Sequence, residues 1–196
     1  FNPSRLPTPA EWVTVRRVRV KDAVNTVWWF SKSENPDADN RRVLLPYSES
    51  MKALIQNGYK AKRRPSGHAI FTKFGRDNGG AIPPNLLTIA NTESNSTYLR
   101  LCREFGIKPH PARFPAKLVE FFVDFLIEPE QNALILDPFG GSNVTGSVAE
   151  AKGHRWITFE REDEYMRGSM LRFLEGPLFA DARLRSVIQG KPSRVD

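Results

Sequence analysis

The chain has 196 residues, of which 40% are hydrophobic and 11% aromatic, so its composition excludes a chain that is disordered throughout. No apolar run approaches the ~18 residues that a membrane-spanning helix needs, and a single cysteine, Cys102, excludes an internal disulfide framework and is typical of a reducing compartment. The formal net charge of +7 lies entirely in residues 1–64, which hold 13 Lys and Arg against 6 Asp and Glu, and this excess indicates either a polyanionic partner or a solvated basic face.

The first half of the chain predicts a β-hairpin followed by a loop-rich stretch. Residues 12–31 alternate valines with arginines, turn at the polar pair 21–22 and return as VNTVWWF, which is typical of two antiparallel strands. Residues 33–109 are rich in Asn, Ser, Pro and Gly. Within them we expect only two short helices, at 48–57 and 96–105.

The rest of the chain is more regular. An apolar helix is predicted at 116–127, a buried strand at 133–136, a helix at 144–152 and a second strand at 156–159. A further helix is expected at 165–174. Because strand, turn, helix and strand follow one another in this order, we expect a β–α–β unit and an α/β fold.

A glycine-rich turn joins the first of these strands to the next helix. It has the sequence LDPFGGSNVTG from Leu136 to Gly146. Glycines let a backbone approach a ligand closely, and a helix N-terminus presents free N–H groups to an anion. Glu160 ends the next strand, 23 positions after Asp137, where nucleoside-binding α/β folds hold a ribose diol. The alternative is a plain tight turn with a solvent-facing glutamate.

The turn departs from the dinucleotide fingerprint G-x-G-x-x-G. Gly141 and Gly146 match its outer glycines, but Asn143 stands at the middle position, where the backbone must meet a pyrophosphate. This argues against NAD. It favours a ligand with an adenosine and no pyrophosphate, such as S-adenosylmethionine.

Other enzyme chemistry has no support in the sequence. His68, His110 and His154 have no Ser or Cys nucleophile at a suitable spacing, and three scattered histidines with one cysteine do not form a metal-site pattern. We therefore interpret His110 as a structural residue before Pro111 rather than as a catalytic base.

Several segments resemble the amino-methylating DNA methyltransferases of restriction–modification systems. The stretch from Leu136 to Tyr165, LDPFGGSNVTGSVAEAKGHRWITFEREDEY, is similar to their cofactor motifs. HPARFP at 110–115 resembles the motif before that loop in the circularly permuted β class, and residues 10–32 resemble the end-of-sheet hairpin of that class. RPSGH at 64–68 resembles the recognition region of its N4-cytosine members. The resemblance implies a partial Rossmann-like, S-adenosylmethionine-dependent methyltransferase fold.

The resemblance also implies regions and residues. It places a hairpin at the edge of the catalytic sheet in 1–32, a target-recognition region in 33–109 and the cofactor-binding part in 110–196. Glu160 takes the ribose hydroxyls of S-adenosylmethionine, and residues 110–114 border its methionine end. The other residues expected at the cofactor are Asp137, Phe139, Gly140, Gly141, Ser142, Asn143, His110, Pro111 and Phe114.

Double-stranded DNA is the implied partner, and the implied location is the prokaryotic cytoplasm at the nucleoid. The basic loop at 60–68 is the best candidate for DNA contact, because arginine can read guanine bidentately and lysine can neutralise phosphate. A solvated surface role stays open for each candidate: Arg41, Arg42, Lys62, Arg63, Arg64, Ser66 and His68. Trp28 and Trp29 can stack on a flipped base, but we interpret both as structural, with one in the core.

The catalytic loop of the family is missing from the 196 residues. It consists of Ser, Asp or Asn, then Pro-Pro and an aromatic residue, and it polarises the exocyclic amine of a base that has left the duplex stack. Pro83-Pro84 lies between Ile82 and Asn85, which supply neither the polar acceptor nor the aromatic ring. In the β class the loop precedes the hairpin, and the chain starts at Phe1 rather than Met. We therefore expect the C-terminal portion of an enzyme, inactive by itself.

The leading hypothesis is an S-adenosylmethionine-dependent DNA cytosine-N4 methyltransferase of a type II restriction–modification system. The alternatives are an N6-adenine DNA methyltransferase, a DNA-binding half of a split enzyme completed by a separate chain, and a small-molecule methyltransferase. The HPARFP and FGGSN forms favour cytosine, and the basic first third argues against a small-molecule substrate.

Overall fold

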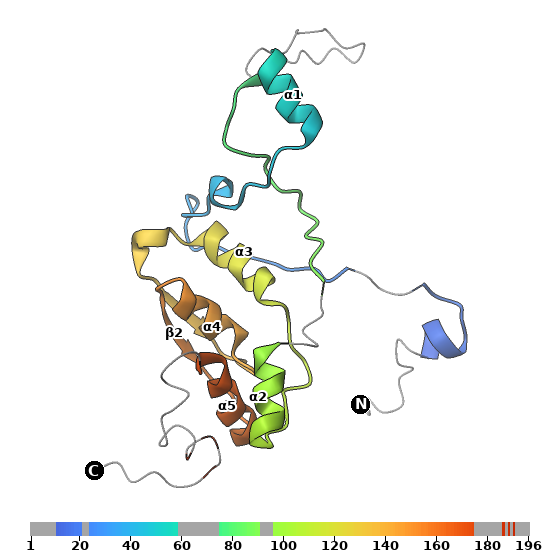
Figure 1. Ribbon diagram of the computed structural model, residues 1–196, viewed down its shortest axis with the longest axis vertical. Coiled ribbons are helices and arrows are strands. Elements are labelled where there is room, and N and C mark those ends of the chain that lie inside the picture. The colour runs from blue at the N-terminus through green and yellow to red at the C-terminus, as the bar shows by residue number, and fades with distance from the viewer. Residues whose placement is uncertain are drawn as a thin grey trace. The chain divides into compact units, whose positions relative to one another are not determined.

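The computed structural model describes residues 11–20, 24–58, 75–90 and 96–174, together with residues 186, 188 and 190. The chain divides into two compact units, Phe1–Pro36 and Asp37–Asp196. The helices α1 to α5 and both described strands belong to the second unit (Figure 1). No helix within the described ranges is long and apolar enough to cross a membrane.

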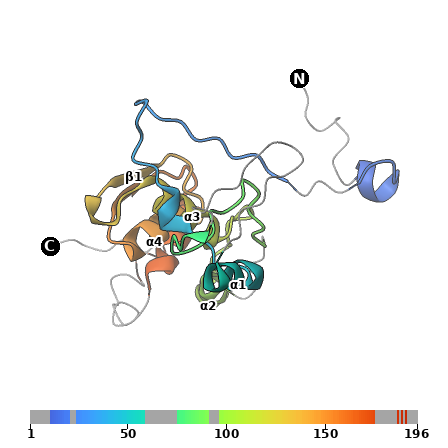
Figure 2. The same ribbon diagram turned by 90° about the horizontal axis from the view of Figure 1, so that it is seen from above.

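A parallel β–α–β unit carries the predicted glycine-rich turn. β1 (Leu134–Asp137) pairs in parallel with β2 (Arg155–Thr158), and Asp137 lies opposite Thr158 at the carboxyl ends of the strands. α4 (Val144–Ala151) joins the two strands, and Figure 2 shows the same unit from above. The predicted order of strand, turn, helix and strand is confirmed, and with it the α/β class.

The long apolar helix α3 (Ala116–Leu126) lies beside α4 in both views (Figures 1 and 2). Val123 of α3 meets Val144 and Val148 of α4 in a small buried cluster, and Ile135 of β1 packs against it. The cluster covers one face of the two-stranded sheet. It thereby fixes the start of α4, where the turn ends.

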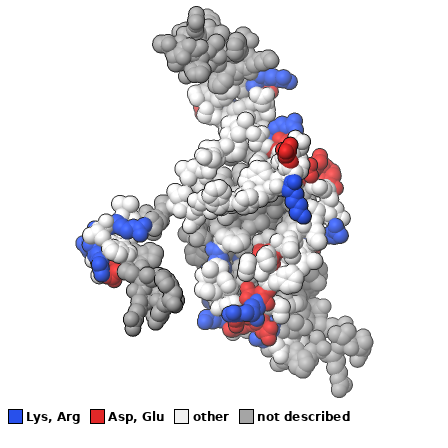
Figure 3. Space-filling view, turned by 180° about the vertical axis from the view of Figure 1, so that it is seen from behind, with Lys and Arg blue, Asp and Glu red and all other residues white. Residues whose placement is uncertain are grey.

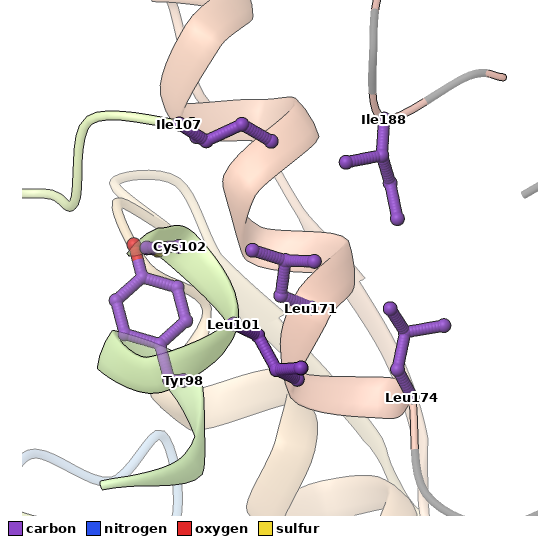
Figure 4. Packing of buried hydrophobic residues seen from close by; sticks show 7 residues of the cluster. All are labelled: Tyr98, Leu101, Cys102, Ile107, Leu171, Leu174 and Ile188. Atoms are coloured by element: carbon purple, nitrogen blue, oxygen red, sulfur yellow. The ribbon is translucent and has the colours of Figure 1, made fainter. Parts of the chain in front are cut away.

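A second core joins helices that are far apart in the sequence. α2 (Thr97–Phe105) packs against η6 (Met170–Phe173), a 3-10 helix that directly continues α5 (Asp163–Ser169). The predicted helix at 165–174 thus begins two residues earlier and ends as a 3-10 turn. Figure 4 shows the buried residues of this core, which are Tyr98, Leu101, Cys102, Ile107, Leu171, Leu174 and Ile188.

Both short helices predicted in the loop-rich stretch are confirmed, with the ends that their sequences indicate. Ser48 precedes α1 (Glu49–Asn57) and Ser96 precedes α2, and each hydroxyl accepts the backbone N–H three residues on, at 3.3 and 3.4 Å. Each helix ends at a glycine with positive φ, 74° at Gly58 and 67° at Gly106.

The described parts of residues 37–90 hold little other regular structure, as their composition indicates. The 3-10 helix η3 (Asn40–Val43) packs against α3, and an isolated antiparallel bridge joins Leu45 to Ala81. A further 3-10 helix, η5 (Pro129–Gln131), leads from α3 to β1. The role of this stretch in target recognition stays a prediction.

The predicted β-hairpin at 12–31 is wrong for the described residues. η2 (Glu11–Val15) is a single π-helical turn, and the described remainder of the segment forms neither helix nor strand, while the predicted turn at 21–22 lies outside the described residues. A two-stranded ribbon is marginally stable without a sheet to extend, and the described sheet contains β1 and β2 alone. The prediction that one tryptophan lies in a core is also wrong, since Trp28 is 77% exposed and Trp29 is 43% exposed.

One face of the β1–β2 sheet is uncovered in the described structure. Leu134, Leu136, Ile157 and Phe159 follow the face opposite Ile135, and between 45% and 60% of each is exposed. Parallel sheets are generally covered on both faces. The uncovered face therefore marks a surface onto which further structure is expected to pack.

Candidate functional site

The turn after β1 folds back onto the end of β2. The Asp137 carboxylate accepts the Phe139 N–H at 3.0 Å, which starts the turn. The Gly140 N–H then donates to the Phe159 carbonyl at 2.8 Å, and the Gly140 carbonyl accepts the Asn143 N–H at 2.7 Å. The predicted cofactor residues 137–143 are thus gathered at the carboxyl ends of both strands, where open α/β sheets bind ligands.

The two adjacent glycines are required by the packing of the protein itself. A Cβ on Gly140 would lie 1.9 Å from the Thr158 hydroxyl oxygen, so a side chain there would require Thr158 to move. Gly141 has a φ of 53°, and a Cβ on it would lie 3.2 to 3.3 Å from the ring of His110. The glycines therefore allow the turn to pack closely against β2 and His110, in addition to any room they leave for a ligand.

Asn143 has a role that the comparison with the dinucleotide fingerprint missed. Its side chain is 2% exposed, and its amide oxygen accepts the Gly146 N–H at 3.0 Å, which caps α4. Its φ of 56° is left-handed, a conformation that asparagine tolerates better than most residues. The signal was present in the sequence, because asparagine directly before a helix is a preferred cap. Any contact of Asn143 with a cofactor would therefore involve its backbone.

Glu160 is held against the turn by two backbone donors. One carboxylate oxygen accepts the Glu162 N–H at 3.0 Å and the other accepts the Gly141 N–H at 2.9 Å. These N–H groups, of Glu162 first and Gly141 second, hold the pKa of Glu160 below its usual range. The carboxylate is half-buried and ionised at neutral pH, and it is available as a hydrogen-bond acceptor beside the turn.

His110 lies directly against the same turn. Its Nδ1 is 2.6 Å from the Ala112 carbonyl, and its ring makes an edge-to-face contact with Tyr165 at 4.6 Å between ring centroids. Its backbone N–H donates to the Tyr98 hydroxyl at 3.2 Å, and its carbonyl accepts a hydrogen bond from the guanidinium of Arg113. These contacts fit the structural role predicted for His110 and bring the 110–114 segment next to Gly141.

Ser142 is held by a residue that sequence reasoning did not single out. Ser142 is 3% exposed, and Arg172 of η6 donates to its carbonyl from Nε at 2.6 Å and to its hydroxyl from Nη2 at 3.0 Å. The two residues are 30 positions apart, so no local pattern connects them.

The site is an open turn rather than an enclosed cavity. Phe139 is 87% exposed and Phe114 is 42% exposed, while Pro111 also lies at the surface. A hollow of about 630 Å³ lies elsewhere, between residues of α3, α4 and η6, and its lining includes none of the predicted cofactor residues. The Thr158 hydroxyl beside Gly140 is buried without a hydrogen-bond partner among the described residues.

The DNA-contact candidates are only partly described. Arg41 forms a bidentate pair with Asp39, whose side-chain hydrogen bonds from Arg41 lower the pKa of Asp39 to about 2. Arg42 donates to the Asp37 carbonyl at 2.9 Å. Acidic and basic side chains are interspersed over the face of the second unit drawn in Figure 3. The remaining candidates lie outside the described residues; they are Lys62, Arg63, Arg64, Ser66 and His68.

Both the sequence and the fold are similar to those of known proteins. The profile of the N6/N4 methyltransferase family, described as DNA methylase, matches residues 2–171. The type II methyltransferase M.PvuII of Proteus hauseri is 58% identical over 178 residues, which cover 89% of this chain and 52% of that relative. The type II methyltransferase M.HinfI of Haemophilus influenzae is 37% identical over 97 residues, 49% of this chain and 26% of the relative.

A solved structure also matches. PvuII DNA methyltransferase (cytosine-N4-specific) superimposes with a TM-score of 0.66 at 44% sequence identity, covering 98% of this chain and 56% of that one. The chain therefore spans about half the length of M.PvuII.

Proposed function

The chain belongs to the DNA methylase family and has the α/β fold of the S-adenosylmethionine-dependent methyltransferases, and on this premise we propose that the whole protein methylates the exocyclic N4 of cytosine in duplex DNA. The protein would act in a type II restriction–modification system in the prokaryotic cytoplasm. The observation that carries the proposal is the Glu160 carboxylate, which lies two residues after β2 and is fixed against the glycine-rich turn by the Gly141 N–H. M.PvuII, 58% identical to this chain, supports the same reaction class.

The residues at the turn fit S-adenosylmethionine, which supplies an electrophilic methyl group when bound. Glu160 is an ionised acceptor for the two ribose hydroxyls. Phe139 offers an exposed ring to the adenine, and the Thr158 hydroxyl is a polar group still without a partner among the described residues. We propose that the 110–114 segment borders the methionine end, since His110 already lies against Gly141.

Transfer to N4 needs a second group of residues. The amine lone pair is delocalised into the cytosine ring, so a polar side chain and a carbonyl must accept its hydrogens, and the base must first leave the duplex. The printed sequence contains no Ser, Asp or Asn followed by Pro-Pro and an aromatic residue. We propose that this loop belongs to the remainder of the methyltransferase fold, and that the present chain corresponds to the C-terminal portion of a circularly permuted β-class enzyme.

The uncovered face of the β1–β2 sheet favours a second arrangement of the same enzyme. Further strands and helices would bury the apolar side chains of this face, which are Leu134, Leu136, Ile157 and Phe159. If these come from a separate polypeptide, the present chain is one half of a split enzyme and is inactive alone. An N6-adenine enzyme is the weaker alternative, because the matching solved structure is that of a cytosine-N4-specific enzyme.

DNA contact is proposed for the basic residues of the first third. The loop residues Lys62, Arg63, Arg64, Ser66 and His68 are the main candidates, with Arg41 and Arg42 in support. Arg41 is already paired with Asp39, so its contribution requires that the pair opens or is shared with a phosphate.

Calorimetric titration of the intact protein with S-adenosylmethionine tests the proposal. Glu160→Ala should weaken binding by about tenfold or more, because it removes a charged acceptor for two hydroxyls. Glu162→Ala is the matched control, since the Glu162 contact with Glu160 uses only the backbone N–H and its own carboxylate is exposed. If Glu160→Ala binds S-adenosylmethionine as tightly as the wild type, the ribose assignment is wrong. If the wild type does not bind S-adenosylmethionine, the proposed function is refuted.

A further inference from the structure

One arginine connects the second hydrophobic core to the glycine-rich turn. Arg172 lies on η6, between core residues Leu171 and Leu174 in sequence. Its guanidinium bonds the Ser142 carbonyl and hydroxyl from two different nitrogens, at 2.6 and 3.0 Å. Such a two-point contact fixes both the position and the orientation of Ser142, because the guanidinium is planar and rigid.

Tyr98 holds the other side of this arrangement. Its ring lies under the guanidinium, 4.4 Å from the Arg172 Cζ to the ring centroid, and it is 3% exposed. Figure 4 shows Tyr98 on α2 in the same core as Leu171. The Tyr98 hydroxyl accepts the His110 N–H at 3.2 Å, and burial raises the pKa of Tyr98 to about 12, so the hydroxyl stays protonated.

The two contacts act at adjacent positions of the turn, on Ser142 directly and on Gly141 through His110. Arg172 holds Ser142, while Tyr98 holds the backbone of His110, whose ring lies against Gly141. Gly141 and Asn143 both have left-handed φ values, 53° and 56°. A turn of this kind persists only where surrounding contacts determine it, and for a non-glycine residue the conformation is unfavourable by itself.

We infer that Arg172 and Tyr98 are positioning residues that set the affinity for S-adenosylmethionine without touching it. The inference rests on the proposed function, because it concerns the same cofactor turn. With Ser142 and His110 fixed, Gly141 is held where its N–H meets Glu160, so the ribose acceptor and the turn are ordered before the cofactor arrives. A site ordered in advance binds more tightly, since less freedom is lost on binding.

The variants separate positioning from general stability. Arg172→Lys keeps a positive charge but replaces the planar fork by a single ammonium, which cannot make both Ser142 bonds in the same geometry. Tyr98→Phe keeps the buried ring under Arg172 and removes the hydroxyl, which accepts the His110 N–H and hydrogen-bonds the Cys102 thiol. Arg100→Ala is the control, because Arg100 lies on α2 next to this region but forms an exposed pair with Glu104.

Steady-state methylation kinetics of the intact enzyme, with calorimetric binding of S-adenosylmethionine, tests the inference. We expect Arg172→Lys and Tyr98→Phe each to raise the KM and Kd for S-adenosylmethionine by about tenfold, with the KM for DNA and kcat nearly unchanged. Arg100→Ala should match the wild type in every parameter.

Each other result overturns the inference in a recognisable way. Wild-type cofactor affinity in both variants overturns the inference alone. A fall in kcat with an unchanged KM for the cofactor shows a smaller folded fraction, hence a merely structural role, and overturns it too. If Arg172→Lys does not fold, Tyr98→Phe decides by the same criteria. A wild type that binds no S-adenosylmethionine overturns the proposed function together with this inference.

Discussion

Replacing Asn143 tests how the glycine-rich turn is built. In the structure this residue does two things at once: its amide oxygen accepts the Gly146 N–H at 3.0 Å, and its backbone has a left-handed φ of 56°. Alanine removes the acceptor and keeps the Cβ that makes the left-handed conformation unfavourable. Glycine removes the acceptor as well but adopts that conformation freely, and aspartate keeps both properties of asparagine.

The magnitudes follow from these two roles. Loss of an N-cap acceptor costs about 1 kcal/mol when alanine replaces it and only a few tenths when glycine does. A left-handed residue with a Cβ and no polar side chain costs about 1 to 2 kcal/mol. Asn143→Ala should therefore lower the free energy of unfolding by about 2 to 3 kcal/mol, and Asn143→Gly by less than about 1 kcal/mol. Asn143→Asp keeps the acceptor at the helix N-terminus, but its carboxylate would be buried at a position that is 2% exposed, so it should be less stable than the wild type and more stable than the alanine variant.

Urea unfolding of the intact protein, analysed with a common m value, measures these differences. An alanine variant that is less stable than both the glycine and the aspartate variants supports both roles of Asn143. If glycine and alanine lower the free energy of unfolding equally, the left-handed backbone conformation does not make the alanine variant less stable. An aspartate variant as unstable as the alanine variant would refute the cap.

Three further predictions concern the free energy of unfolding at low pH, one DNA contact and the uncovered sheet face. Because the Glu162 and Gly141 N–H groups lower the pKa of Glu160, its ionised form contributes stability above the ordinary glutamate pKa, and this contribution is lost as the pH falls through the lower folded-state value. Urea unfolding from about pH 6 to about pH 2 should show this loss in the wild type and less of it in Glu160→Gln, and identical profiles would contradict it. Asp39→Asn releases Arg41 from its carboxylate, so duplex binding should tighten and its salt dependence should steepen by about one phosphate contact, whereas unchanged binding argues that Arg41 faces solvent. Leu136→Lys should destabilise the intact enzyme by about 2 to 4 kcal/mol if further structure covers this face, and a loss under about 0.5 kcal/mol would show that the face stays in water.

The parts of the fold that could be predicted are those with local causes. Ser48 and Ser96 begin helices and Gly58 and Gly106 end them, because caps act within three or four residues of their helix. The β–α–β unit was predicted for a similar reason, since an apolar strand, a glycine turn and a helix follow one another without a gap, although β1 is exposed on one face rather than buried as predicted. The position of Glu160 beside the turn was predicted from its spacing, because the carboxyl ends of neighbouring parallel strands lie at the same edge of a sheet.

The predictions that failed, and the residues that were not predicted, concern features that depend on contacts between residues far apart in the sequence. The valine-rich segment at 12–31 has a strand pattern, but a pattern forms a strand only where a sheet edge is present to pair with it. Arg172 was missed because its partner, Ser142, is 30 positions away and the contact exists only after η6 packs on α2. Asn143 is an intermediate case. Its role as a helix cap has a local signal in the sequence, but the same position also corresponds to the middle glycine of the dinucleotide fingerprint, and only that comparison was used.

The most direct test of the account is the identity of the methylated base. The intact protein is incubated with duplex DNA and isotopically labelled S-adenosylmethionine, the DNA is digested to nucleosides, and the label is located by mass spectrometry. We predict label in N4-methylcytosine, in the wild type and with reduced yield at limiting cofactor in Glu160→Ala. Label in N6-methyladenine would contradict the base assignment, and a wild type that binds the cofactor but labels no DNA base would contradict the proposed function.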